Sequence, residues 1–149
     1  MVTAARLVGT SRARGAATAR AGRPAIYRRN TWIAGVEGEL ITVEPQPVVV
    51  LEGVSVGRRE ITDRLTMLIW VETPFDVRLG RGLERDGEGM RQEWLDWSAQ
   101  EDAHYKADRT RHRADVIVHG DPSVDHDPAS ELVVLGSPSK VTDESLSQR

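Results

Sequence analysis

The run Val48-Val49-Val50-Leu51, followed by Glu52-Gly53, decides how this chain folds. An uninterrupted β-branched and aliphatic run is typical of a strand buried on both faces, as in a parallel sheet with helices on each side. Residues 65–71 and 114–120 contain runs of the same kind, with polar or helical segments between them. This alternation predicts an α/β fold with a mainly parallel sheet flanked by helices.

Two helices are expected between the second and third runs. Thr73-Pro74-Phe75-Asp76 has the order of a helix start, because Thr73 can cap and Pro74 suits the first helical position. We expect this helix to reach about residue 85 and a longer one to cover about residues 90–109. Four large side chains of the longer helix fall near one face, where they would form core contacts: Met90, Trp94, Trp97 and Tyr105.

Short strands are expected on both sides of this region. Residues 25–27 predict a strand, and Trp32-Ile33 with residues 40–43 predict a hairpin around Gly35 and Gly38. Residues 131–135 predict an edge strand. The resulting organisation is a basic, unstructured arm over residues 1–22, an α/β domain over 23–136 and a polar, unstructured tail over 137–149.

Composition restricts the class of protein. The chain has 149 residues, 39% of them hydrophobic, and no cysteine. Disulfides, cysteine-based metal sites and thiol nucleophiles are therefore excluded, and no apolar run approaches the ~18 residues that cross a bilayer. We expect a cytoplasmic protein that has no membrane partner.

Charge is distributed unevenly along the chain. The formal net charge is −3, yet residues 1–30 carry seven arginines and no acidic residue. A basic arm of this kind can bind nucleic acid or an acidic protein surface. Because no recognition motif accompanies the arginines, we consider nucleic acid an improbable partner.

Three groups of residues could carry chemistry. Glu52 directly follows a buried strand, and ligands gather at the carboxyl ends of strands in open α/β sheets. Its alternative role is to cap the next helix. A series of arginines recurs at helical spacing, and the planar guanidinium groups could bind phosphate oxygens. The alternative is a solvated helix face, which gives the same spacing. These arginines are Arg78, Arg81 and Arg85, with Arg91 further on.

The third group is Tyr27-Arg28-Arg29, with Trp32 nearby. Aromatic and guanidinium groups together can stack on a base or bind a phosphate, and a basic strand edge is the alternative. The histidines have no metal-ligand spacing, so no protein metal site is predicted.

These pieces together resemble the uridine-kinase-like P-loop nucleoside kinase family, in particular its actinobacterial type. The resemblance covers about residues 21–135. The stretches that carry it are, in chain order, Gly22-Arg23-Pro24-Ala25-Ile26-Tyr27-Arg28-Arg29 with Trp32, Val48-Val49-Val50-Leu51-Glu52-Gly53-Val54, Trp70-Val71-Glu72-Thr73-Pro74, Asp76-Val77-Arg78-Leu79 with Arg81, Arg85 and Asp86, then Trp94, Glu101-Asp102-Ala103-His104-Tyr105, Ala107-Asp108-Arg109-Thr110-Arg111 and Arg113-Ala114-Asp115.

The resemblance implies an ATP- and Mg²⁺-dependent kinase that phosphorylates a nucleoside or a similar small hydroxyl acceptor. Glu52 would lie near the metal and the attacking hydroxyl. Arg81, Arg85 and Arg91 would match the lid arginines that close over the ATP phosphates, whereas Tyr27 and Arg28 would line the acceptor side. One departure concerns the acceptor side, because the family's Tyr-Asp-Trp is replaced here by Asn30-Thr31-Trp32.

The larger departure is the phosphate loop. Family members carry G-x-x-x-x-G-K-[ST] after the first strand, and its backbone and lysine bind the phosphates. Neither lysine of this chain, Lys106 or Lys140, lies in such a motif. Residues 7–15 have a weak similarity to the loop, but arginines stand where glycines must approach phosphate. We therefore expect a P-loop-kinase-like fold that lacks the first strand and the phosphate loop.

The missing strand has a structural consequence. In the family it lies between the strands that correspond to those ending at Glu52 and Val71, so its loss exposes backbone and apolar surface. A partner, self-association through the exposed strand edges or the chain's own N-terminus could fill the gap. We expect an N-terminally incomplete, kinase-related protein that is inactive as this short chain. The alternative is a non-catalytic α/β binding or assembly module with a basic N-terminal arm.

Overall fold

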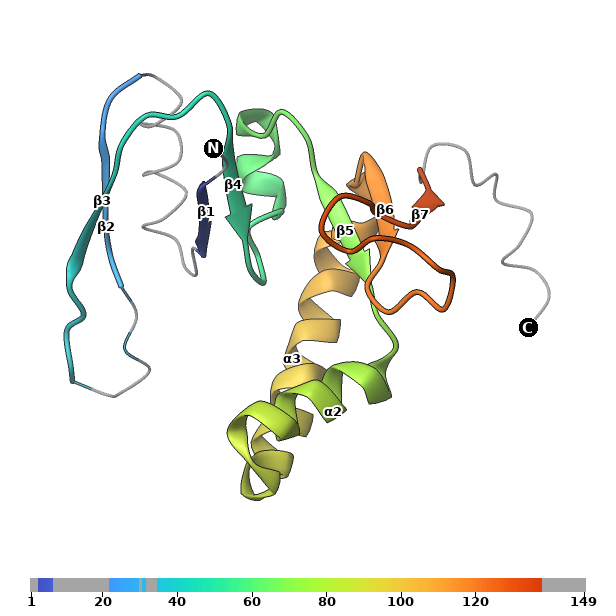
Figure 1. Cartoon of the computed structure of the whole chain (residues 1–149). Coiled ribbons are helices and arrows are strands. Elements are labelled where there is room, and N and C mark those ends of the chain that lie inside the picture. Colours follow the sequence, from blue (N-terminus) through green and yellow to red (C-terminus); the bar gives the residue numbers. More distant parts are fainter. Residues whose placement is uncertain (1–2, 7–21, 30, 32–34, 138–149) are drawn as a thin grey trace. The chain divides into compact units, whose positions relative to one another are not determined.

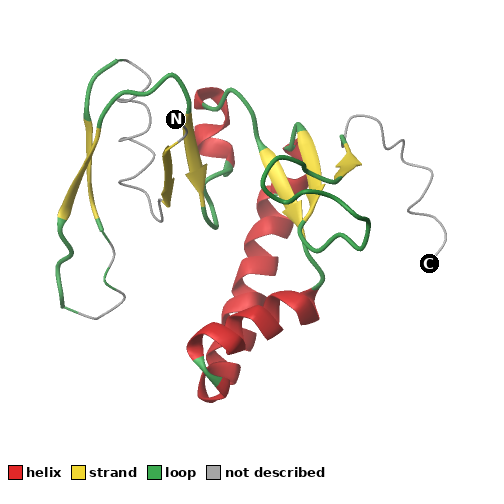
Figure 2. Cartoon of the chain, in the orientation of Figure 1, coloured by secondary structure: helices red, strands yellow, loops and turns green. Residues whose placement is uncertain are grey.

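The chain folds as an α/β protein with several small sheets (Figure 2). The computed structural model describes residues 3–6, 22–29, 31 and 35–137. The chain divides into two compact units, Met1–Arg64 and Leu65–Arg149. The arm, domain and tail expected from the sequence over residues 1–22, 23–136 and 137–149 stay a prediction.

The first unit contains a parallel strand pair. β1 (Thr3–Arg6) pairs with β4 (Val49–Glu52), and the register sets Arg6 opposite Glu52. The apolar run of β4 predicted burial on both faces, and this prediction is wrong. Val49 and Leu51 are half-buried, but Val50, on the other face of the strand, is 41% exposed.

β1 lies within the predicted N-terminal arm, and it pairs with the strand that was expected to lack its neighbour. Thr3–Arg6 forms a strand, so β4 has a parallel neighbour from the chain's own N-terminus, the outcome that the sequence left open. The remaining residues of the arm, except Gly22, lie outside the described residues.

The second strand pair of this unit is antiparallel and joins β2 (Ala25–Arg28) to β3 (Leu40–Val43). The strand predicted at residues 25–27 is confirmed. In the described chain, β3 pairs with this strand, whereas the sequence predicted a hairpin between residues 40–43 and Trp32-Ile33. Trp32 and Ile33, predicted as hairpin partners, lie outside the described residues. Gly38 permits the close approach of the two chains, because a Cβ there would lie 1.8 Å from the carbonyl oxygen of Arg29.

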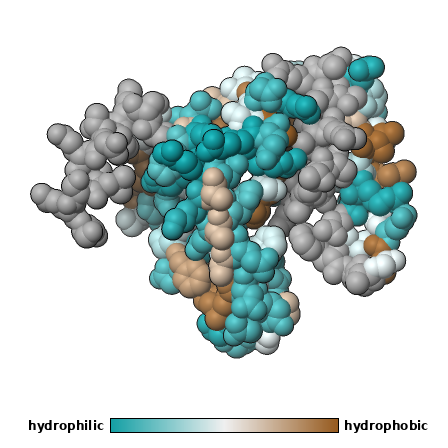
Figure 3. Space-filling model, turned by 180° about the vertical axis from the view of Figure 1, so that it is seen from behind, coloured by the Kyte–Doolittle hydropathy of each residue, from teal (hydrophilic) through white to brown (hydrophobic). Residues whose placement is uncertain are grey.

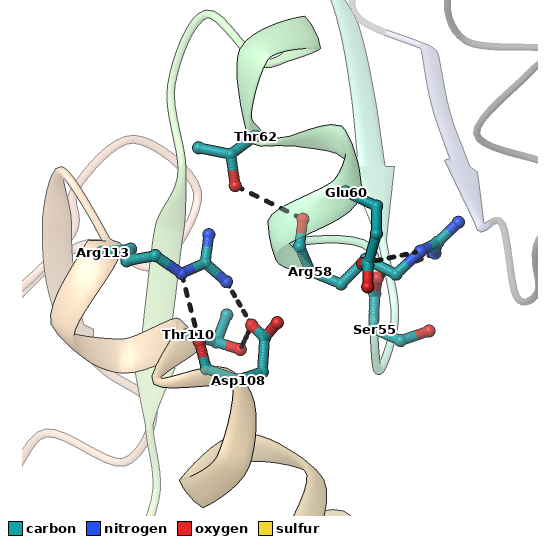
Figure 4. A network of polar contacts seen from close by, with 7 residues as sticks. All are labelled: Ser55, Arg58, Glu60, Thr62, Asp108, Thr110 and Arg113. Carbon is teal, nitrogen blue, oxygen red and sulfur yellow. Dashed lines mark hydrogen bonds and ion pairs between the residues drawn. The ribbon is translucent and has the colours of Figure 1, made fainter.

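A turn and a short helix follow β4. Ser55 has a positive φ of 68°, and its carbonyl accepts a hydrogen bond of 3.1 Å from Arg58 Nη1. The 3-10 helix η1 (Arg59–Arg64) begins next, and Thr62 Oγ1 donates to the Arg58 carbonyl (Figure 4). Ile61 of η1 is buried.

The second unit contains a three-stranded sheet in the order β5-β6-β7. β5 (Ile69–Glu72) and β6 (Val116–His119) are parallel, whereas β7 (Val134–Gly136) is an antiparallel edge strand. Ile117 and Val118 of β6 are only 4% and 5% exposed and form the core of this unit.

The predicted mainly parallel sheet is therefore wrong. Three separate sheets occur in the described residues, and together they are mixed, with parallel pairs β1–β4 and β5–β6 and antiparallel pairs β2–β3 and β6–β7. The physical reason lies in the connections. A parallel pair is joined by a crossover that usually contains a helix, as α2 and α3 provide between β5 and β6, whereas residues 120–133 between β6 and β7 contain no helix and return as an antiparallel strand.

Two long helices connect β5 to β6. α2 (Phe75–Asp86) is followed by the 3-10 turn η2 (Glu88–Met90) and by α3 (Arg91–Asp108), so both predicted helices are confirmed. α2 and α3 lie side by side as a helical hairpin (Figure 1). Trp70 of β5 contacts Tyr105 of α3 edge-on, with ring centroids 4.6 Å apart, which places α3 against one face of the sheet.

Two details of the helix predictions are wrong. The N-cap of α2 is Pro74 without a side-chain hydrogen bond, because the Thr73 side chain lies against Gly120 instead. The four large side chains predicted on one face do not share a buried face: Trp94 and Tyr105 of α3 are half-buried, whereas Trp97 of α3 and Met90 of η2 are 40% and 41% exposed.

A polar network ends α3. Arg109 adopts the left-handed conformation with a φ of 54°, and the short helix α4 (Thr110–Arg113) follows at once. The carboxylate of Asp108 accepts a 2.5 Å hydrogen bond from Thr110 Oγ1 and pairs with Arg113 (Figure 4). Both charged side chains are largely buried, so this pair fixes the direction in which the chain enters β6.

In the part of the chain that the structure describes, no helix is both long and apolar enough to cross a bilayer.

Candidate functional site

Polar groups gather at the carboxyl ends of β5 and β6, the edge at which α/β sheets hold ligands. Glu72 ends β5, and its carboxylate accepts hydrogen bonds from Trp70 Nε1 at 3.1 Å and from Arg111 Nε at 2.5 Å. The backbone of Gly120 donates to the Glu72 carbonyl at 2.8 Å, which fastens the end of β6 to the end of β5. This edge is therefore ordered by its own contacts.

Gly120 is required at this edge by the lack of space. A Cβ there would lie 1.9 Å from Thr73 Oγ1 and 2.9 Å from Val71 Cγ1. Glycine thus lets the chain pass close to Thr73, and the Gly120 carbonyl accepts a hydrogen bond from a side chain of α2.

Arg81 reaches this edge from α2. Its Nη1 donates to the Gly120 carbonyl at 2.9 Å, and its Nη2 pairs with Asp121 at 2.6 Å. The side chains of Arg81 and Asp121 are 55% and 47% exposed. The structure thus holds one of the arginines predicted from the sequence beside the carboxyl end of a parallel strand, within reach of solvent.

Arg85 lies one turn further along α2. Its Nε and Nη2 donate to the two carboxylate oxygens of Asp86, both at 2.8 Å, and its guanidinium lies 5.4 Å from the ring centroid of Trp94. The hydrogen bonds from Arg85 lower the pKa of the Asp86 carboxyl, so this group is ionised at neutral pH.

Arg91 and Arg78 have different surroundings. Arg91, the first residue of α3, pairs with Glu88 at 2.5 Å on the exposed surface. Arg78 instead pairs with Glu101 across the two helices at 2.7 Å, where the Glu101 side chain is 14% exposed. Burial raises the pKa of Glu101, although the charge of Arg78 opposes this effect. Arg78 is thus a packing contact between α2 and α3.

The remaining predicted site residues belong to the first unit. Glu52 is the exposed last residue of β4, next to Arg6 in the register of β1. Tyr27 and Arg28 lie on β2, where Arg28 Nη1 donates to the Gly38 carbonyl at 2.8 Å and pairs with Glu37 at 3.2 Å. Glu52 and Tyr27 are in different sheets of this unit.

The structure therefore brings together only part of the predicted set. Arg81 and Arg85 share α2 with Arg91 at the start of the next helix, all in the second unit. Glu52, Tyr27 and Arg28 occupy the first unit.

Sequence reasoning missed several polar residues at the sheet edge. Asp121 comes just after a buried strand, and Glu72 ends one, so the rule that selected Glu52 would have selected both. Arg111 and the stacking of Trp94 on Arg85 gave no such signal, because both depend on the way α3 returns to the sheet.

Among the described residues, no group of three or more histidine, aspartate or glutamate side chains could hold a metal ion. Single carboxylates such as Glu52 could still contribute one ligand to a Mg²⁺ ion that arrives with a nucleotide, because Mg²⁺ is usually bound by one or two carboxylates and substrate phosphates.

Comparison with known proteins gives a partial match. No protein family model matches the chain. A uridine kinase of Halobacterium salinarum (strain ATCC 700922 / JCM 11081 / NRC-1) is 33% identical over 91 residues, which cover 55% of this chain and 40% of that protein. The chain thus spans well under half of the length of the curated relative that it matches. The match supports a distant uridine-kinase-like relationship.

Proposed function

We propose that this chain is a uridine-kinase-like phosphotransferase, related to enzymes that move the γ-phosphoryl group of ATP to a nucleoside or a similar small hydroxyl acceptor. The observation that carries the proposal is the 33% identity to a uridine kinase over 91 residues. The α/β architecture is consistent with it, as is the position of Arg81 at the carboxyl end of β6.

The proposed roles follow from the chemistry of each residue. Phosphoryl transfer spreads charge over the phosphate oxygens, and guanidinium groups stabilise that charge. Arg81, Arg85 and, further out, Arg91 would bind the ATP phosphates. Glu52 would act on the acceptor hydroxyl and share a Mg²⁺ ion with the phosphates.

Tyr27 and Arg28 would contact the acceptor. Tyr27 is half-buried on β2, so its ring can form one wall of a site, and the Arg28 guanidinium is held by Gly38 and Glu37. The replacement of the family's Tyr-Asp-Trp by Asn30-Thr31-Trp32 would change this wall.

We further propose that the 149-residue chain does not catalyse the transfer. G-x-x-x-x-G-K-[ST] does not occur in its sequence, so the lysine and the loop glycines that bind the β- and γ-phosphates are not supplied. Arginines alone would bind the phosphates loosely, without the geometry that in-line transfer needs.

The test combines transfer and binding. Purified chain, Mg²⁺-ATP and a panel of nucleosides should give no phosphorylated product above background. Mg²⁺-ATP should nevertheless bind weakly, and the double variant Arg81→Ala/Arg85→Ala should bind it ~10-fold or more weakly, because each charge-assisted contact is worth ~1.5–3 kcal/mol. Tyr27→Phe, in the other unit, is the control and should leave ATP binding unchanged. Equal affinity of the double variant and the unmodified chain would refute the role of the arginines, and robust phosphorylation would refute the inactivity.

An assembly module is the second candidate, and the exposed apolar side chains of the strands favour it. Apolar patches interrupt the hydrophilic surface (Figure 3), and such patches mark interaction sites. The exposed apolar residues of β4, β5 and their approaches are Val48, Val50, Met67, Ile69 and Val71. Size-exclusion chromatography with light scattering distinguishes the candidates, since a monomer at all concentrations and salt levels would count against assembly.

A further inference from the structure

The Arg85 guanidinium is fixed on two sides by its neighbours. Asp86 accepts from Nε and Nη2, each at 2.8 Å, and the Trp94 ring lies under the cation at 5.4 Å from its centroid. Trp94 Nε1 donates to the same Asp86 carboxylate at 3.1 Å. The three side chains therefore orient one another.

The indole is held from behind as well. A Cβ on Gly82 would lie 2.6 Å from Cε2 of Trp94, so the ring packs directly on the α2 backbone. Gly82 is buried there. The orientation of Trp94 is thus set by the contact between α2 and α3, not by Arg85 alone.

These contacts leave part of the guanidinium for another acceptor. Arginine has five N–H donors in a fixed plane. Among the described residues, Asp86 takes one donor of Nε and one of Nη2, and the Arg85 side chain is 58% exposed. The outer fork, formed by Nη1 and Nη2, has the geometry that matches two oxygens of a phosphate.

We propose that Asp86 and Trp94 are positioning residues that hold the outer fork of Arg85 in one orientation for binding a polyphosphate. The inference rests on the proposed function, in which Arg85 binds phosphates. A flexible arginine loses rotamer freedom when it binds, and a pre-oriented one loses less of it. Trp94 provides the ring face on which the cation is most strongly held.

A competing role for Asp86 makes the opposite prediction. If Asp86 mainly neutralised Arg85, its removal would free a positive charge and tighten the binding of any anion. If Asp86 positions Arg85, its removal weakens binding despite the gain of positive charge. The sign of the effect of Asp86→Asn therefore separates the two roles.

The experiment is a calorimetric titration of the full chain with inorganic tripolyphosphate, in low salt. Arg85→Ala should weaken binding ~10-fold, the loss of one charge-assisted pair. Trp94→Leu and Asp86→Asn should each weaken it ~3-fold, and Trp94→Phe, which keeps an aromatic face, by less than ~2-fold. Trp97→Leu is the matched control, because Trp97 is on the same helix and 40% exposed, and it should bind like the unmodified chain.

A mutant cycle distinguishes positioning from a general structural effect. In the Arg85→Ala background, Trp94→Leu and Asp86→Asn should cause no further loss, because residues that act through Arg85 have nothing left to orient. A loss that persists in this background would overturn the proposal. Circular dichroism confirms folding, and Asp86→Asn and Trp94→Phe test the proposal even if Trp94→Leu fails to fold.

The outcomes separate this inference from the proposed function. Unchanged binding by Arg85→Ala would overturn both the positioning and the phosphate-binding role of Arg85. Weaker binding by Arg85→Ala, together with unchanged or tighter binding by Asp86→Asn and Trp94→Leu, would overturn the positioning alone and leave the proposed function standing.

Discussion

The two parallel strand pairs in the described part of the molecule, β1–β4 and β5–β6, have different surroundings, although β4, β5 and β6 all have apolar sequences. In the second unit, α2 and α3 connect β5 to β6, and α3 packs on the sheet through Tyr105. Ile117 of β6 is only 4% exposed as a result. In the first unit, Val50 of β4 is 41% exposed, and β1 reaches β4 along a segment whose residues are only partly described.

The difference shows what an apolar run does and does not encode. The run predicts the strand in both units, because β-branched residues favour extended chain. Burial depends on a covering element and on neighbouring strands, and only central strand β6 is buried on both faces, at Ile117 and Val118, whereas Ile69 and Val71 of its neighbour β5 are 46% and 56% exposed. The stability of the described molecule should therefore reside mainly in the second unit.

Truncating the core of the second unit should have the largest effect. Ile117→Ala leaves a cavity at a site that is 4% exposed, so it should lower the free energy of unfolding by ~2–5 kcal/mol. Val50→Ala in β4 is the control and should cost less than ~1 kcal/mol, because that side chain already contacts water. Urea unfolding measures both, and equal losses would show that the two strand pairs are buried alike in solution.

Two glycines of α2 sharpen the comparison within the second unit. Gly82→Ala would drive a Cβ to 2.6 Å from the Trp94 ring, so it should destabilise the protein by ~1–3 kcal/mol. Gly80→Ala meets nothing within 4 Å and should stabilise α2 by up to ~1 kcal/mol, because alanine is the better helix former. Thermal melts should move in opposite directions. A shift in the same direction for both would mean that Trp94 does not pack on the α2 backbone.

The Arg81–Asp121 pair should contribute little to stability. Both side chains are about half exposed, and exposed pairs typically yield 0.2–1 kcal/mol. A double-mutant cycle with Arg81→Ala and Asp121→Ala measures the coupling, which 0.5 M salt should reduce. A coupling above ~2 kcal/mol would indicate a structural tie and weaken the case that Arg81 is available to a ligand.

The smallest effect concerns pH and compares two carboxyls with opposite shifts. Burial raises the pKa of Glu101, so its contribution to stability is present below its ordinary value of 4.5 and is lost as pH rises through the raised pKa. Arg85 lowers the pKa of Asp86, so that contribution is lost as pH falls through the lowered pKa.

Glu101→Gln should therefore gain melting temperature relative to the unmodified chain between pH 4 and 7, by less than ~4 °C. Asp86→Asn should show the opposite trend at lower pH, losing relative stability as pH rises from the lowered pKa of Asp86 through its ordinary value of 3.8. Differential scanning calorimetry across both ranges is the measurement, and parallel trends for the two variants would contradict the assigned environments.

The sequence predicted elements better than it predicted their arrangement. The strand at residues 25–27, the strands around Val50 and Val118, and both long helices follow from local patterns and occur in the structure. The single, mainly parallel sheet does not, because strand pairing depends on connections that cross most of the chain. Antiparallel β7 illustrates this, since nothing within residues 131–135 specifies the direction of its partner.

The candidate site was predictable to a similar degree. Helical spacing identified Arg81 and Arg85, but their partners Asp121 and Trp94 come from the segment after β6 and from α3 and are visible only in three dimensions. Thr73 failed as a cap for the same reason, because the close approach of Gly120 places its hydroxyl elsewhere. A contact between distant segments was the missing information in each case.

The most direct test of the kinase relationship is to supply the missing phosphate loop. β1 runs parallel to β4 and ends at Arg6 opposite Glu52, so a loop placed after β1 would begin at the end of the sheet that carries Glu52. Arg14→Gly, Gly15→Lys and Ala16→Thr complete G-x-x-x-x-G-K-[ST] with Gly9. The measurement is phosphoryl transfer from Mg²⁺-ATP to nucleosides by this triple variant, with and without Glu52→Gln. We predict transfer by the triple variant that Glu52→Gln abolishes while ATP binding remains. Tight Mg²⁺-ATP binding without any transfer, or transfer that does not depend on Glu52, would contradict the account.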